Sequence, residues 1–244
     1  MIVLFTDFGI EGPYIGQMKN VLLRDAPQTP LIDLMHDAPN FDPHAAAYLL
    51  AALVSEFSRD AIFLGVVDPG VGSARPACVV NVDGRWFVGP DNGMFNVVAM
   101  RGSEVRWWDI TWRPERLSAS FHGRDLFAPV AAMLAKGRDV PGNEVDPQTR
   151  IITGWTPEYP QVIYIDHYGN AMTGIRAASV PVDARVSMGK HKLPRAYTFS
   201  DVPDGQGFWY ENSIGLVEIA VNKAGAAAKL GIELGNRVHL DGQL

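Results

Sequence analysis

The sequence predicts two domains: an α/β N-terminal domain, with a mostly parallel sheet covered by helices on both faces, and a small all-β, barrel-like C-terminal domain. Up to about residue 135, short apolar runs alternate with helical patterns, as in strand–helix–strand units. A stretch rich in Pro, Gly and polar residues follows and indicates a linker. Beyond it, short runs alternate with turns and no long helical pattern. We place the domains at residues 1–140 and 159–244, with a linker at 141–158.

The elements of the N-terminal domain follow from its periodicity. Three buried strands are predicted at "MIVLFT", "PLIDL" and "AIFLGVV". The run "ACVVNVDGRWFVG" predicts a hairpin because Asp83-Gly84 is a preferred two-residue turn. Helices are predicted at residues 12–25, 43–56 and 124–136, the second starting at Pro43.

The short runs of the C-terminal domain are "QVIYIDHYGNAMTGI", "RVSMG", "RAYTF", "FWYENSIGLVEIAV" and "NRVHL". We find no internal repeat.

Composition narrows the class of protein. Hydrophobic residues make up 47% of the 244 positions, which is ample for a sizeable core. The net charge of −6 and the absence of a basic stripe argue against a nucleic-acid partner. Cys78 is the only cysteine, so no internal disulfide can form. The longest apolar run, "AAAYLLAALV", is too short to span a membrane, and the first residues lack a basic signal region. We expect a cytoplasmic protein without membrane or nucleic-acid partners.

Acidic residues follow the predicted strands. Asp7 comes after the first strand, Asp68 after the third and Asp91 after the hairpin. Ligands of open α/β sheets bind beyond the carboxyl ends of the strands. Each acid alone also fits a turn or a helix cap, but their shared location favours a functional site. The polar stretch "SFHGRD" at 120–125 starts a predicted helix and adds His122 to the candidates.

Seven stretches in this order resemble the S-adenosyl-L-methionine hydroxide adenosyltransferases, which are relatives of fluorinating and chlorinating enzymes. They are "LFTDFG", "YIGQMKN", "VVDPGVGSAR", "GPDNG", "SFHGRDLFAPVAA", "IDHYGNAMT" and "NSIGLVEIAVNKAGAA". The resemblance covers the chain from Ile2 to about Gly231. It implies an in-line attack of a water-derived hydroxide on the ribose 5′ carbon of S-adenosyl-L-methionine. Adenosine and L-methionine would be the products, and no metal or cofactor would be needed.

The resemblance also implies a catalytic triad of Asp68, Arg75 and His122. Asp68 would hold the guanidinium in a fixed orientation, and Arg75 and His122 would position a water and stabilise its hydroxide-like form. Halogenating relatives have Tyr at the position of Asp68 and Ser at that of Gly123, where a halide is held. Water is therefore the expected nucleophile.

Eight further residues are implied to bind the substrate. Asp7 would hold the ribose hydroxyls, Tyr168 would stack on the adenine, and Ser213 would contact the methionine carboxylate. Ile214 stands where halogenating relatives have an Arg, so one carboxylate contact is missing. The full set is Asp7, Phe41, Phe121, Gly123, Asp166, Tyr168, Asn170 and Ser213, in which Asp166 and Asn170 would bind the methionine amino and carboxylate groups.

Assembly and two alternative functions complete the expectations. The resemblance implies a homotrimer in which the N-terminal domain of one subunit and the C-terminal domain of its neighbour share the substrate. A metal-dependent phosphoesterase or nucleotidase using Asp7, Asp91 and His122 is one alternative. A non-catalytic sensor of nucleosides or S-adenosyl-L-methionine is the other. The tryptophans of "VRWWDITW" have no assigned role in the site, and core or subunit packing fits them best; they are Trp107, Trp108 and Trp112.

Overall fold

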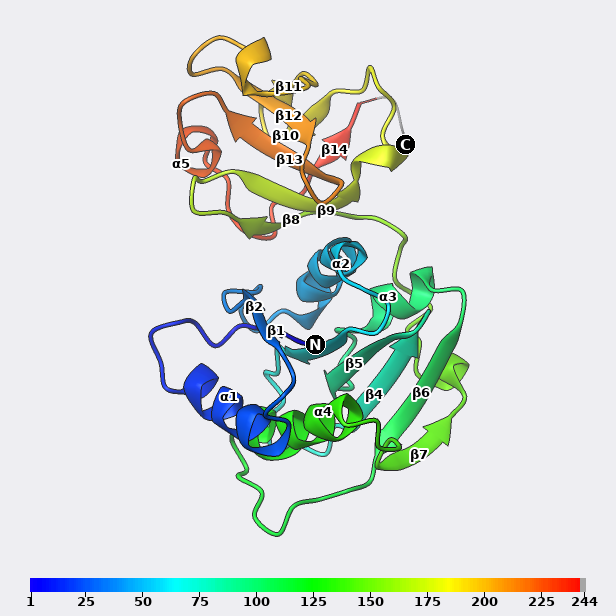
Figure 1. Cartoon of the computed structure of the whole chain (residues 1–244). Coiled ribbons are helices and arrows are strands. Elements are labelled where there is room, and N and C mark those ends of the chain that lie inside the picture. Colours follow the sequence, from blue (N-terminus) through cyan, green and yellow to red (C-terminus); the bar gives the residue numbers. More distant parts are fainter. Residues whose placement is uncertain (242–244) are drawn as a thin grey trace. The chain divides into compact units, whose positions relative to one another are not determined.

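The computed structural model describes residues 1–241, and the chain divides into two compact units between Trp155 and Thr156. Figure 1 shows helices on a large sheet in the N-terminal unit and mostly strands in the C-terminal unit. Two domains of these classes were predicted.

The N-terminal sheet is mixed, not mostly parallel. Its seven strands have the order β2-β1-β3-β5-β4-β6-β7. The pairs among β2, β1, β3 and β5 are parallel, and the remaining three pairs are antiparallel. The strands are β1 (Ile2–Thr6), β2 (Leu31–Met35), β3 (Ile62–Val66), β4 (Ala77–Val82), β5 (Arg85–Pro90), β6 (Val105–Ile110) and β7 (Gly142–Val145).

The predicted hairpin is the reason for this mixture. Asp83 and Gly84 both have positive φ, 50° and 93°, as the tight turn requires. The turn reverses the chain, so that β5 pairs with β3 and β4 lies beyond it, antiparallel to β5 and β6.

Helices cover both faces of this sheet, as predicted (Figure 1). Along β1, Ile2 and Leu4 pack with Met18 and Leu22 of α1. The helices are α1 (Tyr14–Asp25), α2 (Pro43–Leu53), α3 (Asn96–Arg101) and α4 (Ala128–Ala135); α1 contacts α4, and α2 contacts α3. Successive strand residues point to opposite faces, so one buried strand serves both layers.

The tryptophans pack in the core of the N-terminal unit. Trp107 and Trp108 lie on β6 and are 2% and 7% exposed. Trp112 packs against the same apolar cluster as Trp108. Core packing is thus the role of Trp107 and Trp108 in the structure, and Trp112 is partly buried against the core.

The segment predicted as a linker, 141–158, contains the boundary between the units. Most of it nevertheless belongs to the N-terminal unit, because β7 pairs with β6. Further along, the buried Asn96 side chain binds the backbone of Ile152 on both sides. Its Oδ1 accepts from the Ile152 N–H at 2.7 Å, and its Nδ2 donates to the Ile152 carbonyl at 3.1 Å.

The C-terminal unit contains a four-stranded sheet, β12-β13-β9-β8, and a three-stranded sheet, β11-β10-β14. Trp209 lies at the centre of its core and donates its ring N–H to the Ala184 carbonyl at 3.1 Å. The barrel-like closure stays a prediction, since hydrogen bonding defines two sheets. Its elements are β8 (Tyr159–Ile165), β9 (Ala171–Arg176), β10 (Val186–Met188), β11 (His191–Leu193), β12 (Gly207–Glu211), β13 (Leu216–Val221), α5 (Ala226–Leu230) and β14 (His239–Leu240).

Within residues 1–241, no helix is both long and apolar enough to cross a bilayer.

We predict that Asn96→Ala lowers the free energy of unfolding of the N-terminal unit by about 1–3 kcal/mol, because it leaves the Ile152 backbone groups without their partner. Urea denaturation followed by tryptophan fluorescence measures this change. Asn143→Ala, at an exposed position of β7, is the matched control and should change stability by less than about 0.5 kcal/mol. Equal stability of the two variants would contradict this role of Asn96.

Candidate active site

A buried ion pair lies beyond the carboxyl end of β3. The Arg75 Nε donates to Asp68 Oδ1 at 2.6 Å, and its Nη2 donates to Asp68 Oδ2. The two side chains are only 11% and 4% exposed. A third donor, Nη1, binds the Pro76 carbonyl at 2.9 Å. Because the planar guanidinium is held by three acceptor atoms, its orientation is fixed.

The loop between Asp68 and Arg75 turns back at Gly72. This residue has φ of +80°, and a Cβ added there would lie 2.5 Å from the Ala119 carbonyl oxygen. Only glycine fits both the left-handed backbone and this close approach. The loop therefore brings Arg75 back to Asp68 while packing against the segment that leads to His122.

His122 contacts the same guanidinium. Its Nδ1 lies 3.3 Å from Arg75 Nη2. Arginine has no acceptor, so Nδ1 must accept this hydrogen bond and the neutral ring carries its proton on Nε2. Burial, followed by the positive charge of Arg75, lowers the pKa of His122 below its ordinary value of 6.5. The imidazole is therefore neutral at pH 7 and offers an N–H beside the guanidinium.

A short π-helical segment, Gly123–Phe127, begins directly after His122 and leads into α4. The predicted helix at 124–136 thus combines two kinds of helix. Such π-helical turns occur often at functional sites. Here the segment also places the Phe127 ring under Arg75, 5.4 Å from its guanidinium carbon.

A cavity of about 580 Å³ opens next to this triad, a volume typical of small-molecule sites. It holds predicted residues from four separate segments of the chain. Of these residues, the cavity is lined by Asp7, Phe41, Asp68, Phe121, His122 and Gly123.

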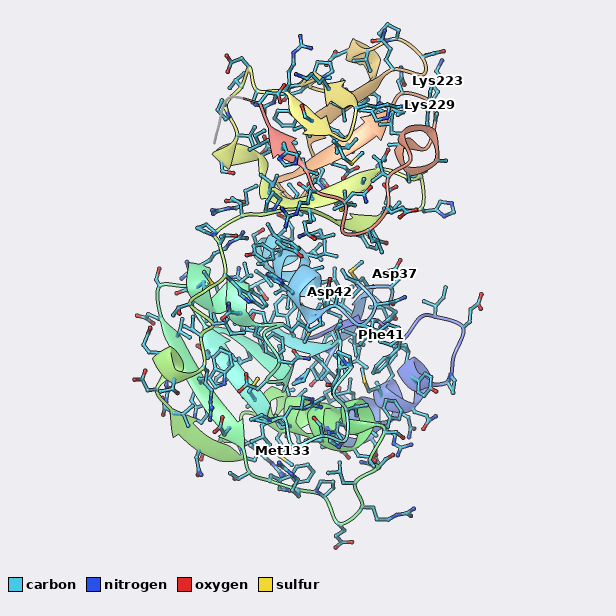
Figure 2. All side chains as sticks on the ribbon, turned by 180° about the vertical axis from the view of Figure 1, so that it is seen from behind. Asp37, Phe41, Asp42, Met133, Lys223 and Lys229 are labelled. Atoms are coloured by element: carbon cyan, nitrogen blue, oxygen red, sulfur yellow. The ribbon has the colours of Figure 1, made fainter. Side chains whose placement is uncertain are left out.

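Asp7 lies at the end of β1 and contacts Phe41. Its Oδ2 accepts the backbone N–H of Phe41 at 3.2 Å. Phe41 has φ of 58° and its side chain is 77% exposed, just before Asp42, which caps α2 (Figure 2). Burial raises the pKa of Asp7, although the backbone hydrogen bond from Phe41 opposes the shift.

Three aromatic rings form one wall of the cavity. Phe8, Tyr14 and Phe121 contact one another with ring centroids 5.4–5.9 Å apart. A Cβ at Gly123 would lie 3.3 Å from both phenylalanine rings. Sequence reasoning assigned Phe121 but missed Phe8 and Tyr14. Phe8 directly follows the predicted site residue Asp7 in the sequence, and this position could have indicated it.

A larger groove, of about 1430 Å³, lies beside α1 and α4. It is lined by none of Asp68, Arg75 and His122. We therefore place the candidate site in the smaller cavity, which is lined by Asp7, Asp68 and His122.

Asp91 has a different partner. It forms an ion pair with Arg150 at 3.8 Å, and Arg150 also binds Asp109. Among residues 1–241, no group of three or more His, Cys, Asp or Glu side chains is arranged to hold a metal ion. The structure thus does not bring Asp7, Asp91 and His122 together as the phosphoesterase alternative requires.

The other predicted substrate-binding residues lie on turns of the C-terminal unit. Asp166 Oδ1 accepts the backbone N–H groups of Tyr168 and Asn170 at 2.9 and 2.8 Å, and Asn170 Nδ2 donates to Oδ2 at 3.1 Å. Tyr168 is 77% exposed at this turn between β8 and β9. Ser213 is exposed on the turn between β12 and β13.

Comparison with known proteins identifies the family. Models of the SAM hydroxide adenosyltransferase N-terminal and C-terminal domains match residues 2–143 and 160–239. The chain is 38% identical to a protein of Thermus thermophilus named (R)-S-adenosyl-L-methionine hydrolase, over 98% of both chains. A protein of the same name from Salinispora arenicola is 36% identical, over 96% of this chain and 95% of its own.

A crystal structure from Thermotoga maritima, titled as an uncharacterized conserved protein, superposes with a TM-score of 0.89 and 32% identity. The match covers 98% of this chain and 100% of that one. Both domain models match in order and together cover most of the sequence. The chain therefore belongs to the SAM hydroxide adenosyltransferase family.

Proposed function

We propose that this protein hydrolyses S-adenosyl-L-methionine to adenosine and L-methionine. The observation that carries the proposal is the contact of Asp68, Arg75 and His122 at the edge of a cavity of substrate size. The hydrolases to which the chain is 36–38% identical support the same reaction.

The ribose hydroxyls bind to Asp7. A carboxylate has about four lone-pair sites, and the Phe41 N–H occupies one of them. Acceptor capacity remains for two hydroxyls. The rings of Phe8, Tyr14 and Phe121 give one wall of the cavity an apolar surface.

The nucleophile is a water bound between Arg75 and the Nε2–H of His122. Two N–H donors favour the hydroxide-like form of its oxygen. A bond forms from that oxygen to C5′ while the C5′–S bond breaks, and its electron pair goes to the methionine sulfur. The water proton leaves to solvent. Negative oxygen and positive sulfonium both lose charge, so a dry cavity favours the transition state over the ground state.

The methionine end binds to the C-terminal unit. Asp166 and Asn170 hold the amino and carboxylate groups, Ser213 contacts the carboxylate, and Tyr168 stacks on the adenine. Carboxylate and amide groups offer the acceptors and donors that such a ligand needs.

We also propose that the reaction needs no metal or cofactor, that the protein is a homotrimer with sites at subunit interfaces, and that it is cytoplasmic.

We predict that reaction in oxygen-18 water places the label in the 5′-hydroxyl of adenosine and none in methionine, because hydroxide attacks C5′. Mass spectrometry of both products measures this. Chloride should yield little halogenated nucleoside, because Gly123 offers no hydroxyl to hold a halide. Unlabelled adenosine, efficient halogenation or loss of activity in a chelator would overturn the mechanism.

Replacing Arg75 or His122 by Ala should lower kcat by roughly two to four powers of ten, the usual cost of losing a positioned charge or proton donor. KM should change less. Arg106→Ala is the control, because Arg106 forms an exposed ion pair with Glu144 on the same sheet. Steady-state kinetics on folded variants tests the assignment, which fails if either triad variant retains the turnover of the control.

The acid limb of kcat/KM should lie below pH 6.5. Burial and Arg75 lower the pKa of His122, so the neutral imidazole persists below its ordinary value of 6.5, and protonation then places a second cation beside Arg75. A pH profile measures the limb, and Asp7→Asn should retain it. A limb centred above pH 6.5 would contradict the role of neutral His122.

A further inference from the structure

A buried carboxylate in the C-terminal unit has no role in the proposed chemistry. Glu218 lies on β13 and is 2% exposed, between five apolar residues of the same strand. None of the ion pairs formed by residues 1–241 includes it. Burying a carboxylate is costly unless hydrogen bonds compensate, so its partners indicate what it does.

Two side chains of the preceding strand and turn donate to Glu218. Tyr210 donates its hydroxyl to Oε1 at 2.6 Å, and Asn212 donates its amide Nδ2 to Oε2 at 2.7 Å. Tyr210 faces Glu218 directly across β12 and β13. The carboxylate therefore fixes which end of the Asn212 amide points into the sheet.

The other end of that amide shapes the turn. Asn212 Oδ1 accepts the backbone N–H groups of Ile214 and Leu216 at 3.1 and 2.9 Å. The turn contains Gly215, which has φ of +77°, and it presents Ser213 to the exterior. A rotated amide would place its NH₂ group against these two N–H donors, so the turn depends on the orientation that Glu218 imposes.

Glu218 also lies near the turn that carries Asp166. Glu218 pairs in register with Met172 of β9, the strand that follows this turn. The negative charge of Asp166 also contributes to the raised pKa of Glu218, after the larger effect of burial. Glu218 thus lies between the two turns proposed to bind the methionine end.

We propose that Glu218 is a positioning residue for the methionine carboxylate, acting through Asn212 to hold the turn of Ser213. This inference rests on the proposed function. It assigns Glu218 the role of a hydrogen-bond acceptor and not of a substrate ligand.

Three variants test the inference with S-adenosyl-L-methionine as substrate. Glu218→Met keeps the length of the side chain but removes both acceptors, and it should raise KM roughly tenfold or more with kcat within about twofold, the effect expected from losing a hydrogen bond to a charged group. Glu218→Gln should restore KM to within about threefold of the parent enzyme, because its amide oxygen still accepts from Asn212. Glu211→Met, at an exposed position of β12, is the matched control and should leave both constants unchanged.

Two further measurements separate positioning from general loss of structure. Decarboxylated S-adenosyl-L-methionine lacks the carboxylate that Ser213 would contact. With this compound as substrate, Glu218→Met and the parent enzyme should have equal KM. Asn212→Ala should reproduce the effect of Glu218→Met, and the double variant should be no worse than either single one. If Glu218→Met does not fold, Asn212→Ala carries the test alone.

The inference is overturned if Glu218→Met behaves like the Glu211 control, if KM rises equally for both substrates, or if the two single effects add. A parent enzyme that produces no adenosine would instead overturn the proposed function.

Discussion

The candidate site depends on the ion pair between Asp68 and Arg75. Three acceptor atoms hold the rigid guanidinium of Arg75. In this orientation Nη2 contacts His122 as well as Asp68. Because arginine can only donate, this contact selects the tautomer of His122 and directs its remaining N–H elsewhere. The ion pair in turn depends on Gly72, because the loop can return Arg75 to Asp68 only if no side chain stands at this position.

Burial shifts the pKa values of the carboxyl and the imidazole of the cavity in opposite directions. It raises the pKa of Asp7 and lowers that of His122, because desolvation disfavours whichever form is charged. A neutral His122 can accept from Arg75, whereas a protonated one would repel it. Phe8, Tyr14 and Phe121 line the same cavity as both groups, so apolar surface and the two shifted side chains lie together.

In the C-terminal unit a buried carboxylate also orients its neighbours, but the groups that donate to it are neutral. Glu218 is buried with a hydroxyl and an amide in place of a cation. Fixing an amide by its donor end fixes its acceptor end, and two backbone N–H groups then set the turn of Ser213. In both units, an exposed or cavity-lining group is oriented by a carboxylate that itself stays buried.

The sequence by itself determined the local features. Apolar periodicity located β1, β2 and β3, Asp83-Gly84 defined the hairpin, and the motifs identified the family. These depend on residues close in the chain. Sequence reasoning did not find β6, β7 or α3. The adjacent tryptophans of β6 and the polar residues of β7 lack a clear period, and α3 has only six residues, too few to show one.

Only the tertiary structure decided which of these features meet. It pairs β5 with β3, giving a mixed sheet, and it binds Ile152 to Asn96 across 56 residues. It pairs Asp91 with Arg150, which no local pattern indicated. Strand order and long-range hydrogen bonds depend on packing between distant segments, and no local pattern encodes that packing.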